Sequence, residues 1–164
     1  MTNEKISFLL LCTCGGVALA ADDDITFHGT LVAPPVCTIS GGKTLEVEFR
    51  DLIIDSINGD YGRKEVKYDL SCDSEIRDPD WNMTLTWTGT QTAYNDSAIE
   101  TDVPGFGIEL QHDGQPFKLN TPLTINATDF TQKPKLEAVP VKSVDAVLSD
   151  TTFSAYATLR VDYQ

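Results

Sequence analysis

Cysteine and histidine are the residues of this sequence best suited to redox, metal or nucleophilic chemistry, and both are scarce. Two of the four cysteines lie within the first twenty residues, a segment that we expect to be removed on export, which leaves Cys37 and Cys72. In an exported protein such a pair normally forms a disulfide. Closing a loop of about 36 residues stabilises a fold by roughly 4 kcal/mol. No metal site is expected, because neither His28 nor His112 stands at ligand spacing from a cysteine.

A catalytic triad needs a histidine beside a serine and a carboxylate, and the two histidines are poorly placed for one. His28 lies in the N-terminal segment, and His112 lies in a predicted turn with Asp113 and Gly114. The sequence has no Gly-x-Ser-x-Gly elbow and no zinc signature. We therefore expect a protein that is not an enzyme and that binds no cofactor.

Trp81 and Trp87 are candidate stacking platforms for a glycan. They alternate in step with Met83 and Leu85, and residues two apart along a strand share one face. We expect both tryptophans to face the core.

Residues 1–20 have the pattern of a secretory signal peptide. Lys5 supplies a positive charge, residues 6–14 are mostly apolar, and Ala18 and Ala20 offer the small residues that signal peptidase recognises. The apolar run is too short to span a bilayer, which takes about 20 apolar residues. We expect cleavage after Ala20.

The chain is acidic, with a formal net charge of −13 at pH 7. Glu4 and Lys5 cancel within the predicted signal peptide, so the mature chain keeps this charge. Such a balance argues against nucleic acid and anionic membranes as partners.

The elements that position these residues are predicted to be strands, because side-chain polarity alternates with a period of two along most of the chain. The longest alternation is the last one, from Phe153 to Gln164. Its apolar face consists of Phe153, Ala155, Ala157, Leu159, Val161 and Tyr163. We expect one strand here, with one buried face.

Shorter strands of the same kind are expected elsewhere, and no helix longer than a turn or two is expected. The strands cover residues 45–49, 66–72, 81–87, 106–110, 123–125 and 136–141, the last weakened by Pro140. Turn signals rich in Gly, Asn, Asp and Pro separate them, and residues 51–57 suit one short helical turn. About seven short strands with one disulfide predict an all-β sandwich.

A strand-like segment near the N-terminus stands apart from this sandwich. Its apolar face is formed by Ile25, Phe27, Gly29 and Leu31. Pro34 and Pro35 then interrupt pairing, because neither has an N–H to donate. The pattern alone leaves open whether this is an edge strand of the same domain or a strand separate from it.

Four segments together resemble the chaperone–usher pilins of Gram-negative bacteria, over essentially the whole chain. Residues 25–39 look like the family's N-terminal extension running into its first cysteine strand, and Cys72 fits the second cysteine. Residues 105–110 are similar to the family's Gly-x-Gly-Ile strand. Residues 153–159 with Tyr163 resemble the pilin C-terminal signature.

This resemblance implies an incomplete immunoglobulin-like β-sandwich, the pilin fold, which lacks its last strand. The missing strand leaves a hydrophobic groove beside the C-terminal strand, which ends at Gln164. A periplasmic chaperone then lends a strand to this groove. At the outer-membrane usher, the N-terminal extension of the next subunit replaces that strand. The implied organisation is a signal peptide over 1–20, a donor-strand extension over 21–34 and a pilin domain over 35–164.

Within this family, the sequence favours a minor tip adaptor that polymerises by donor-strand exchange and supports adhesion. The Pro34-Pro35-Val36-Cys37 entry and residues 137–141 look more like adaptors than rod subunits, although Val36 is an extra residue between the prolines and the cysteine. The expected partners are the chaperone, the usher and neighbouring pilus subunits, with a tip adhesin among the candidates. The alternatives are a major rod pilin and a self-contained immunoglobulin-like binding module.

Overall fold

The computed structural model describes residues 25–31, 33, 35–73, 82–126, 129 and 132–163. The predicted signal peptide, Trp81 and Gln164 lie outside these residues. The chain divides into two units, Met1–Val32 and Ala33–Gln164, and each is considered by itself.

The regular secondary structure described in the second unit is almost entirely β-strand, as the period-two alternation predicted. The strands are β1 (Cys37–Ile39), β2 (Lys64–Val66), β3 (Leu70–Cys72), β4 (Met83–Gly89), β5 (Ala98–Glu100), β6 (Phe106–His112), β7 (Gln115–Pro116), β8 (Leu123–Ile125), β9 (Leu136–Lys142) and β10 (Ala157–Tyr163). The structure also has the 3-10 turns η1 (Ser40–Gly42) and η2 (Ile54–Ser56), the latter inside the predicted helical turn. No helix among the described residues has the length and apolarity needed to cross a membrane.

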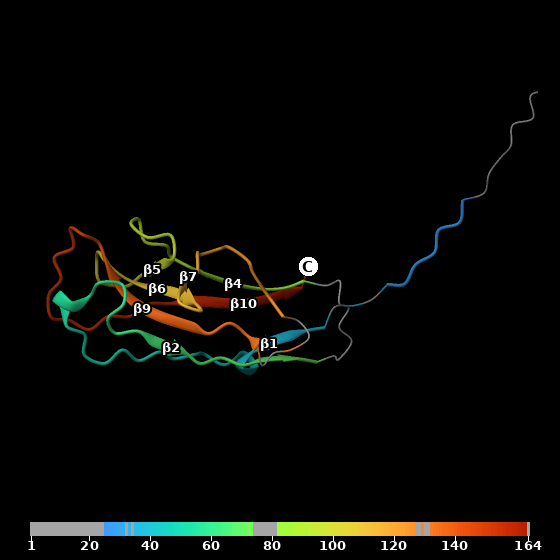
Figure 1. Cartoon of the computed structure of the whole chain (residues 1–164), viewed down its shortest axis with the longest axis horizontal. Coiled ribbons are helices and arrows are strands. Elements are labelled where there is room, and N and C mark those ends of the chain that lie inside the picture. Colours follow the sequence, from blue (N-terminus) through green and yellow to red (C-terminus); the bar gives the residue numbers. More distant parts are fainter. Residues whose placement is uncertain are drawn as a thin grey trace, which may run out of the picture. The chain divides into compact units, whose positions relative to one another are not determined.

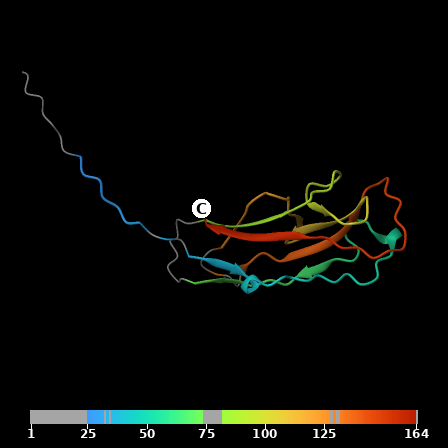
Figure 2. The same ribbon diagram turned by 180° about the vertical axis from the view of Figure 1, so that it is seen from behind.

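Antiparallel pairing arranges the strands in two larger sheets and one small one (Figures 1 and 2). One larger sheet has the order β2-β9-β6-β5, with β7 also paired to β6, and the other has the order β10-β4-β8. The small sheet pairs β1 with β3 and places Cys37 opposite Cys72. The fold is thus the predicted all-β sandwich with one disulfide, between Cys37 and Cys72.

The core lies between the two larger sheets, since alternate side chains of strands in both sheets belong to one buried cluster. Met83, Leu85 and Trp87 enter it from β4, and Ile108 and Leu110 enter it from β6. Trp87 is buried, as expected, and its indole N–H donates to the carbonyl oxygen of Phe117 at 2.7 Å.

Two predicted strands differ clearly from the structure because of the pairing that their residues find or lack. The segment over 45–49 is extended but forms no strand. The segment over 66–72 is split, because β2 pairs with β9 whereas β3 pairs with β1. Between these two strands Tyr68 is buried, and its hydroxyl donates to the carbonyl oxygen of Pro134 at 2.7 Å.

The C-terminal strand begins four residues later than predicted. Ala157 is paired with Gly89, the last residue of β4, so residues 153–156 have no ladder to join. Ser154 is held instead by the side chain of Asp102, whose carboxylate accepts from its backbone N–H at 2.8 Å. Phe153 and Ala155 still pack against the core, so the predicted parity holds without the pairing.

Pro140 lies within β9 without breaking it. The β2 ladder on one side of β9 ends at Ala138, so at Pro140 the ladder partner is Ile108 of β6. A proline is tolerated where a strand has one neighbour.

Candidate functional site

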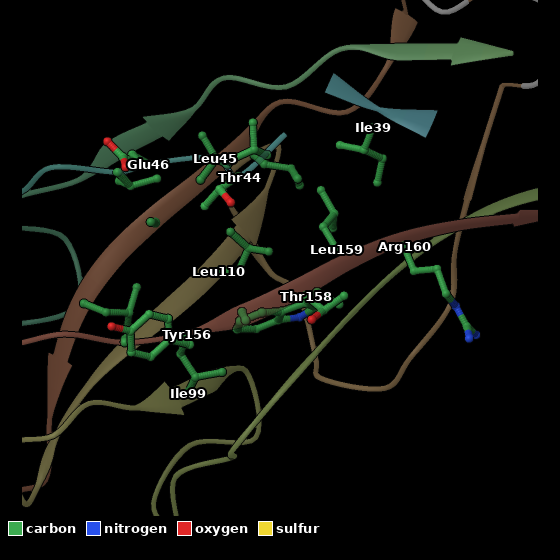
Figure 3. A pocket seen from close by; sticks show the side chains of 18 of the residues that line it. Ile39, Thr44, Leu45, Glu46, Ile99, Leu110, Tyr156, Thr158, Leu159 and Arg160 are labelled. Atoms are coloured by element: carbon green, nitrogen blue, oxygen red, sulfur yellow. The ribbon is translucent and has the colours of Figure 1, made fainter. Parts of the chain in front are cut away.

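An apolar groove of about 810 Å³ runs along the sandwich of the second unit. One wall is the C-terminal segment from Phe153 to Val161, and the other is the chain from Lys43 to Phe49. Figure 3 shows Leu159 of the first wall facing the space beside Ile39 and Leu45, while Arg160 points away from it. The walls thus present apolar side chains inward and polar side chains outward.

The first wall is an edge strand. β10 pairs with β4 over its whole length, from Ala157 opposite Gly89 to Tyr163 opposite Met83. Among the described residues no strand pairs with its other edge, which borders the groove. Such an edge carries backbone N–H and C=O groups that are ready to pair with an added strand.

The second wall follows from the same alternation, although it forms no ladder. Leu45, Val47 and Phe49 pack against the core, whereas Thr44, Glu46 and Glu48 are exposed. The backbone is extended here but lacks a strand partner among the described residues. A strand inserted in the groove would have this wall on one side and β10 on the other.

The floor of the groove is the sandwich core itself. Side chains from both larger sheets reach it, namely Trp87, Ile99, Ile108, Leu110, Leu136 and Ala138. These residues are buried, although the groove lies above them.

The disulfide lies at one end of the groove, which we call the disulfide end (Val36, Cys37, Cys72 and Tyr163). The Tyr163 hydroxyl lies 3.5 Å from Sγ of Cys37 and 3.6 Å from Sγ of Cys72. The end of β10 therefore contacts the β1–β3 sheet at this end of the groove.

Aromatic rings close the opposite end. Phe153 packs edge-on against Phe106, with ring centroids 4.8 Å apart, and at 5.9 Å from Phe49. This cluster ties the start of one wall to the end of the other. The groove is therefore bounded at both ends by side chains that the sequence places on its walls.

The first unit is described over residues 25–31. These residues form no helix or strand. Ile25, Phe27 and Leu31 are among the most exposed large apolar side chains of the molecule, at 75%, 89% and 103%.

One carboxylate whose pKa is lowered by neighbouring cations, Glu137, lies on β9 and not on a groove wall. Lys135 and Arg63 lower the pKa of Glu137, Lys135 by a hydrogen bond at 2.9 Å and Arg63 by an ion pair at 3.2 Å. Both contacts hold a largely buried Glu137 side chain, 12% exposed, at the surface of β9. Among the described residues, no cluster of three or more His, Cys, Asp or Glu side chains is arranged to hold a metal ion.

Most of the residues predicted for the C-terminal wall line the groove. Phe153, Ala155, Ala157, Leu159 and Val161 all do, whereas Tyr163 lies against the disulfide. Gln164 is outside the described residues. Sequence reasoning did not identify the second wall or the floor, although the alternation over 45–49 carried the signal for the wall.

Comparison with known proteins gives one consistent family. The family described as "Fimbrial protein" matches residues 25–164. The uncharacterized fimbrial-like protein YfcQ of Escherichia coli K12 is 79% identical over 161 residues, which cover 98% of this chain and 99% of that protein.

Solved structures show the same fold. The P pilus adaptor subunit PapF matches with a TM-score of 0.54 and 22% identity, over 80% of this chain and 97% of that one. The P pilus rod subunit PapA matches with a TM-score of 0.58 and 23% identity, over 86% of this chain and 100% of that one. The match over residues 25–164 and the 79% identity to a fimbrial-like protein confirm the family indicated by the sequence motifs: the chain belongs to the fimbrial protein family, the subunits of chaperone–usher pili.

Proposed function

We propose that this protein is a minor tip adaptor pilin, which joins its neighbours by donor-strand exchange and so supports adhesion. One observation carries the proposal. The body has an open apolar groove beside an unpaired strand edge, and residues 25–31 present apolar side chains to solvent.

The groove supplies both parts of a strand-binding site. Unpaired backbone groups of β10 give affinity by β-strand addition, and the apolar walls select alternate side chains. Left empty, an edge of this kind promotes aggregation. We therefore infer that a strand of a periplasmic chaperone fills the groove after export. At the outer-membrane usher, the N-terminal extension of the next subunit then replaces that strand.

Residues 21–34 supply the complementary strand. Ile25, Phe27 and Leu31 have the spacing of one strand face, and their burial in a neighbour's groove contributes about 2 kcal/mol each. Gly29 has no atom within 4 Å of the position that a Cβ would occupy. Its own surroundings do not require glycine, and we infer that it fits a part of the neighbour's groove that is too shallow for a side chain; a local bulge is the alternative role.

The adaptor role rests on sequence features rather than on the fold, because an adaptor and a rod subunit match the fold with similar TM-scores. The Pro34-Pro35-Val36-Cys37 entry and residues 137–141 favour the adaptor. A count of subunits in isolated fibres separates the two roles, since an adaptor is present in few copies and a rod subunit in many.

The direct experiment removes the strand and gives it back. We expect the chain without residues 21–34 to be unstable or self-associating when expressed alone in the periplasm. A synthetic peptide of residues 22–32 should restore a soluble monomer, because it pairs with β10 and covers the groove. Sedimentation and urea unfolding measure both states.

The control peptide carries Phe27→Asp, which places a charge on the apolar face and should not rescue. A truncated chain that is monomeric and unfolds cooperatively without any peptide would contradict the proposal. It would support a self-contained module instead.

A further inference from the structure

Two valines and an isoleucine are among the exposed large apolar residues of the body. Val144 and Val147 are 98% and 96% exposed, and Ile53 is 62% exposed. None of the three lines the groove. Large apolar side chains held fully in solvent mark contact surfaces when they gather in one place.

These residues gather at one end of the sandwich. The ammonium group of Lys142 donates to the carbonyl oxygen of Ile54 at 2.9 Å, which ties the turn after β9 to η2. Figures 1 and 2 both place η2 and this turn at the end opposite β1 and the C-terminal residues. We call Ile53, Val144 and Val147 the valine end.

The turn that carries the valines is held in place by its own hydrogen bonds. The Ser143 N–H donates to the Gly105 carbonyl at 2.9 Å, and the Ala146 N–H donates to the Ser143 carbonyl at 3.1 Å. Leu148 packs against the core, whereas Val144 and Val147 do not. The fold thus holds these two valines outward rather than leaving them on a loose loop.

The geometry of a linear fibre decides which end of the groove faces the subunit that donates its strand. The extension of each subunit leaves its body just before β1, at the disulfide end. If a donor body also lay against the disulfide end of its acceptor, that end would have to hold the acceptor's own extension and two neighbouring bodies. Head-to-tail growth avoids this crowding only when the donor body lies at the valine end.

We propose that the valine end is the contact surface for the body of the strand-donating fimbrial subunit, which meets it with its own disulfide end. This inference rests on the proposed strand exchange. It adds a contact between the bodies of the two subunits to the contact between the donated strand and the groove. Val36, 66% exposed at the disulfide end, is the apolar counterpart on the donor.

The surroundings of the valine end have the composition of an interface. Exposed carboxylates of Asp55, Asp145 and Asp150 are adjacent in sequence to the apolar residues or within a few positions of them. An apolar centre with a polar rim is the usual arrangement of a protein contact. The donor's body would cover the centre and leave the rim in solvent.

The test separates the contact of the bodies from the binding of the strand. The acceptor is the mature chain, residues 21–164, with Phe27→Asp so that it cannot donate. The donor is a second copy of the mature chain whose groove is filled by a fused C-terminal copy of residues 22–32. Dissociation rates are measured for the acceptor with this donor and for the acceptor with the synthetic peptide of residues 22–32.

In an acceptor that also carries Val144→Asp and Val147→Asp, we expect the donor to dissociate about tenfold faster or more, since two apolar contacts are lost. The peptide should dissociate at an unchanged rate. The matched control acceptor carries Thr88→Asp and Thr124→Asp, which add the same charge at exposed positions on β4 and β8. It should behave like the parent with both ligands.

The outcomes distinguish the two proposals. A parent acceptor that does not bind the peptide at all would overturn the strand exchange. If the peptide binds and the valine variant releases the donor at the parental rate, the contact surface alone is wrong. Equal acceleration for donor and peptide would also contradict it, because the substitutions would then act on the groove.

Discussion

Gly107 of β6 lies in close contact with its surroundings. A Cβ built there would lie 2.7 Å from the carbonyl oxygen of Ile99 and 2.8 Å from both Cγ2 of Thr92 and the hydroxyl of Tyr94. Ile99 belongs to β5, where it pairs with Ile108, the residue after Gly107, so its backbone has little room to move. Glycine is therefore required by the close approach of backbone, not by its own torsion angles.

We predict that Gly107→Ala lowers the free energy of unfolding by about 1–3 kcal/mol, because a methyl group is forced against a fixed carbonyl. Urea unfolding of the mature chain with a fused C-terminal copy of residues 22–32 measures this with the groove filled. Gly29→Ala in the natural extension is the control, since a Cβ there meets nothing within 4 Å. Equal stability of the two variants would show that β5 gives way.

At the scale of elements, alternation in the sequence predicted which face of each segment is buried but not which segments pair. The face formed by Leu45, Val47 and Phe49 is turned inward although the segment has no ladder. The face of residues 153–155 is likewise correct, while its pairing starts only at Ala157. Burial follows from side-chain polarity within one segment, whereas pairing depends on where the neighbouring segment ends.

The floor of the groove was beyond sequence reasoning for the same reason. Ile108, Leu136 and Trp87 lie on three strands that are distant in sequence, and their meeting depends on the register of two sheets. Short strands such as β5 and β7 were missed, because two or three residues cannot show an alternation. The wall of β10 was found because its alternation is long.

The extension is the element whose two faces differ most in their expected role. Its apolar face includes Phe27, and its other face includes Thr26. We predict that Phe27→Asp in the peptide of residues 22–32 weakens binding to the groove about 30-fold or more, since roughly 2 kcal/mol of apolar burial is lost. Titration against the mature chain carrying Phe27→Asp in its own extension measures the affinity.

Thr26→Asp in the same peptide is the matched control, with an identical charge one residue away. We expect it to bind within a few-fold of the natural peptide, because Thr26 would point away from the groove floor. If both substitutions weaken binding equally, the strand does not enter the groove on the face that contains Phe27.

At the scale of the whole molecule, the acidic charge opposes the proposed assembly through the groove and the extension. Each copy carries a formal net charge of −13, so two copies that meet in solution repel each other. In the proposed function a chaperone protects the empty groove from aggregation, and the repulsion between bodies would add to this protection. Association then depends on how far the charge is screened.

We predict that the donor with the filled groove associates with the acceptor several-fold faster in 0.1 M NaCl than in 0.01 M, because the Debye length falls from about 30 Å to about 10 Å. Stopped-flow mixing measures the rate. An end-blocked peptide of residues 25–31 is the control, since it contains no acidic residue and is not repelled. Its rate should stay nearly constant over the same range. A donor association rate that is unchanged or falls with added salt would contradict this prediction. It would mean that the two contact surfaces carry complementary charges, which attract locally despite the net repulsion of the bodies.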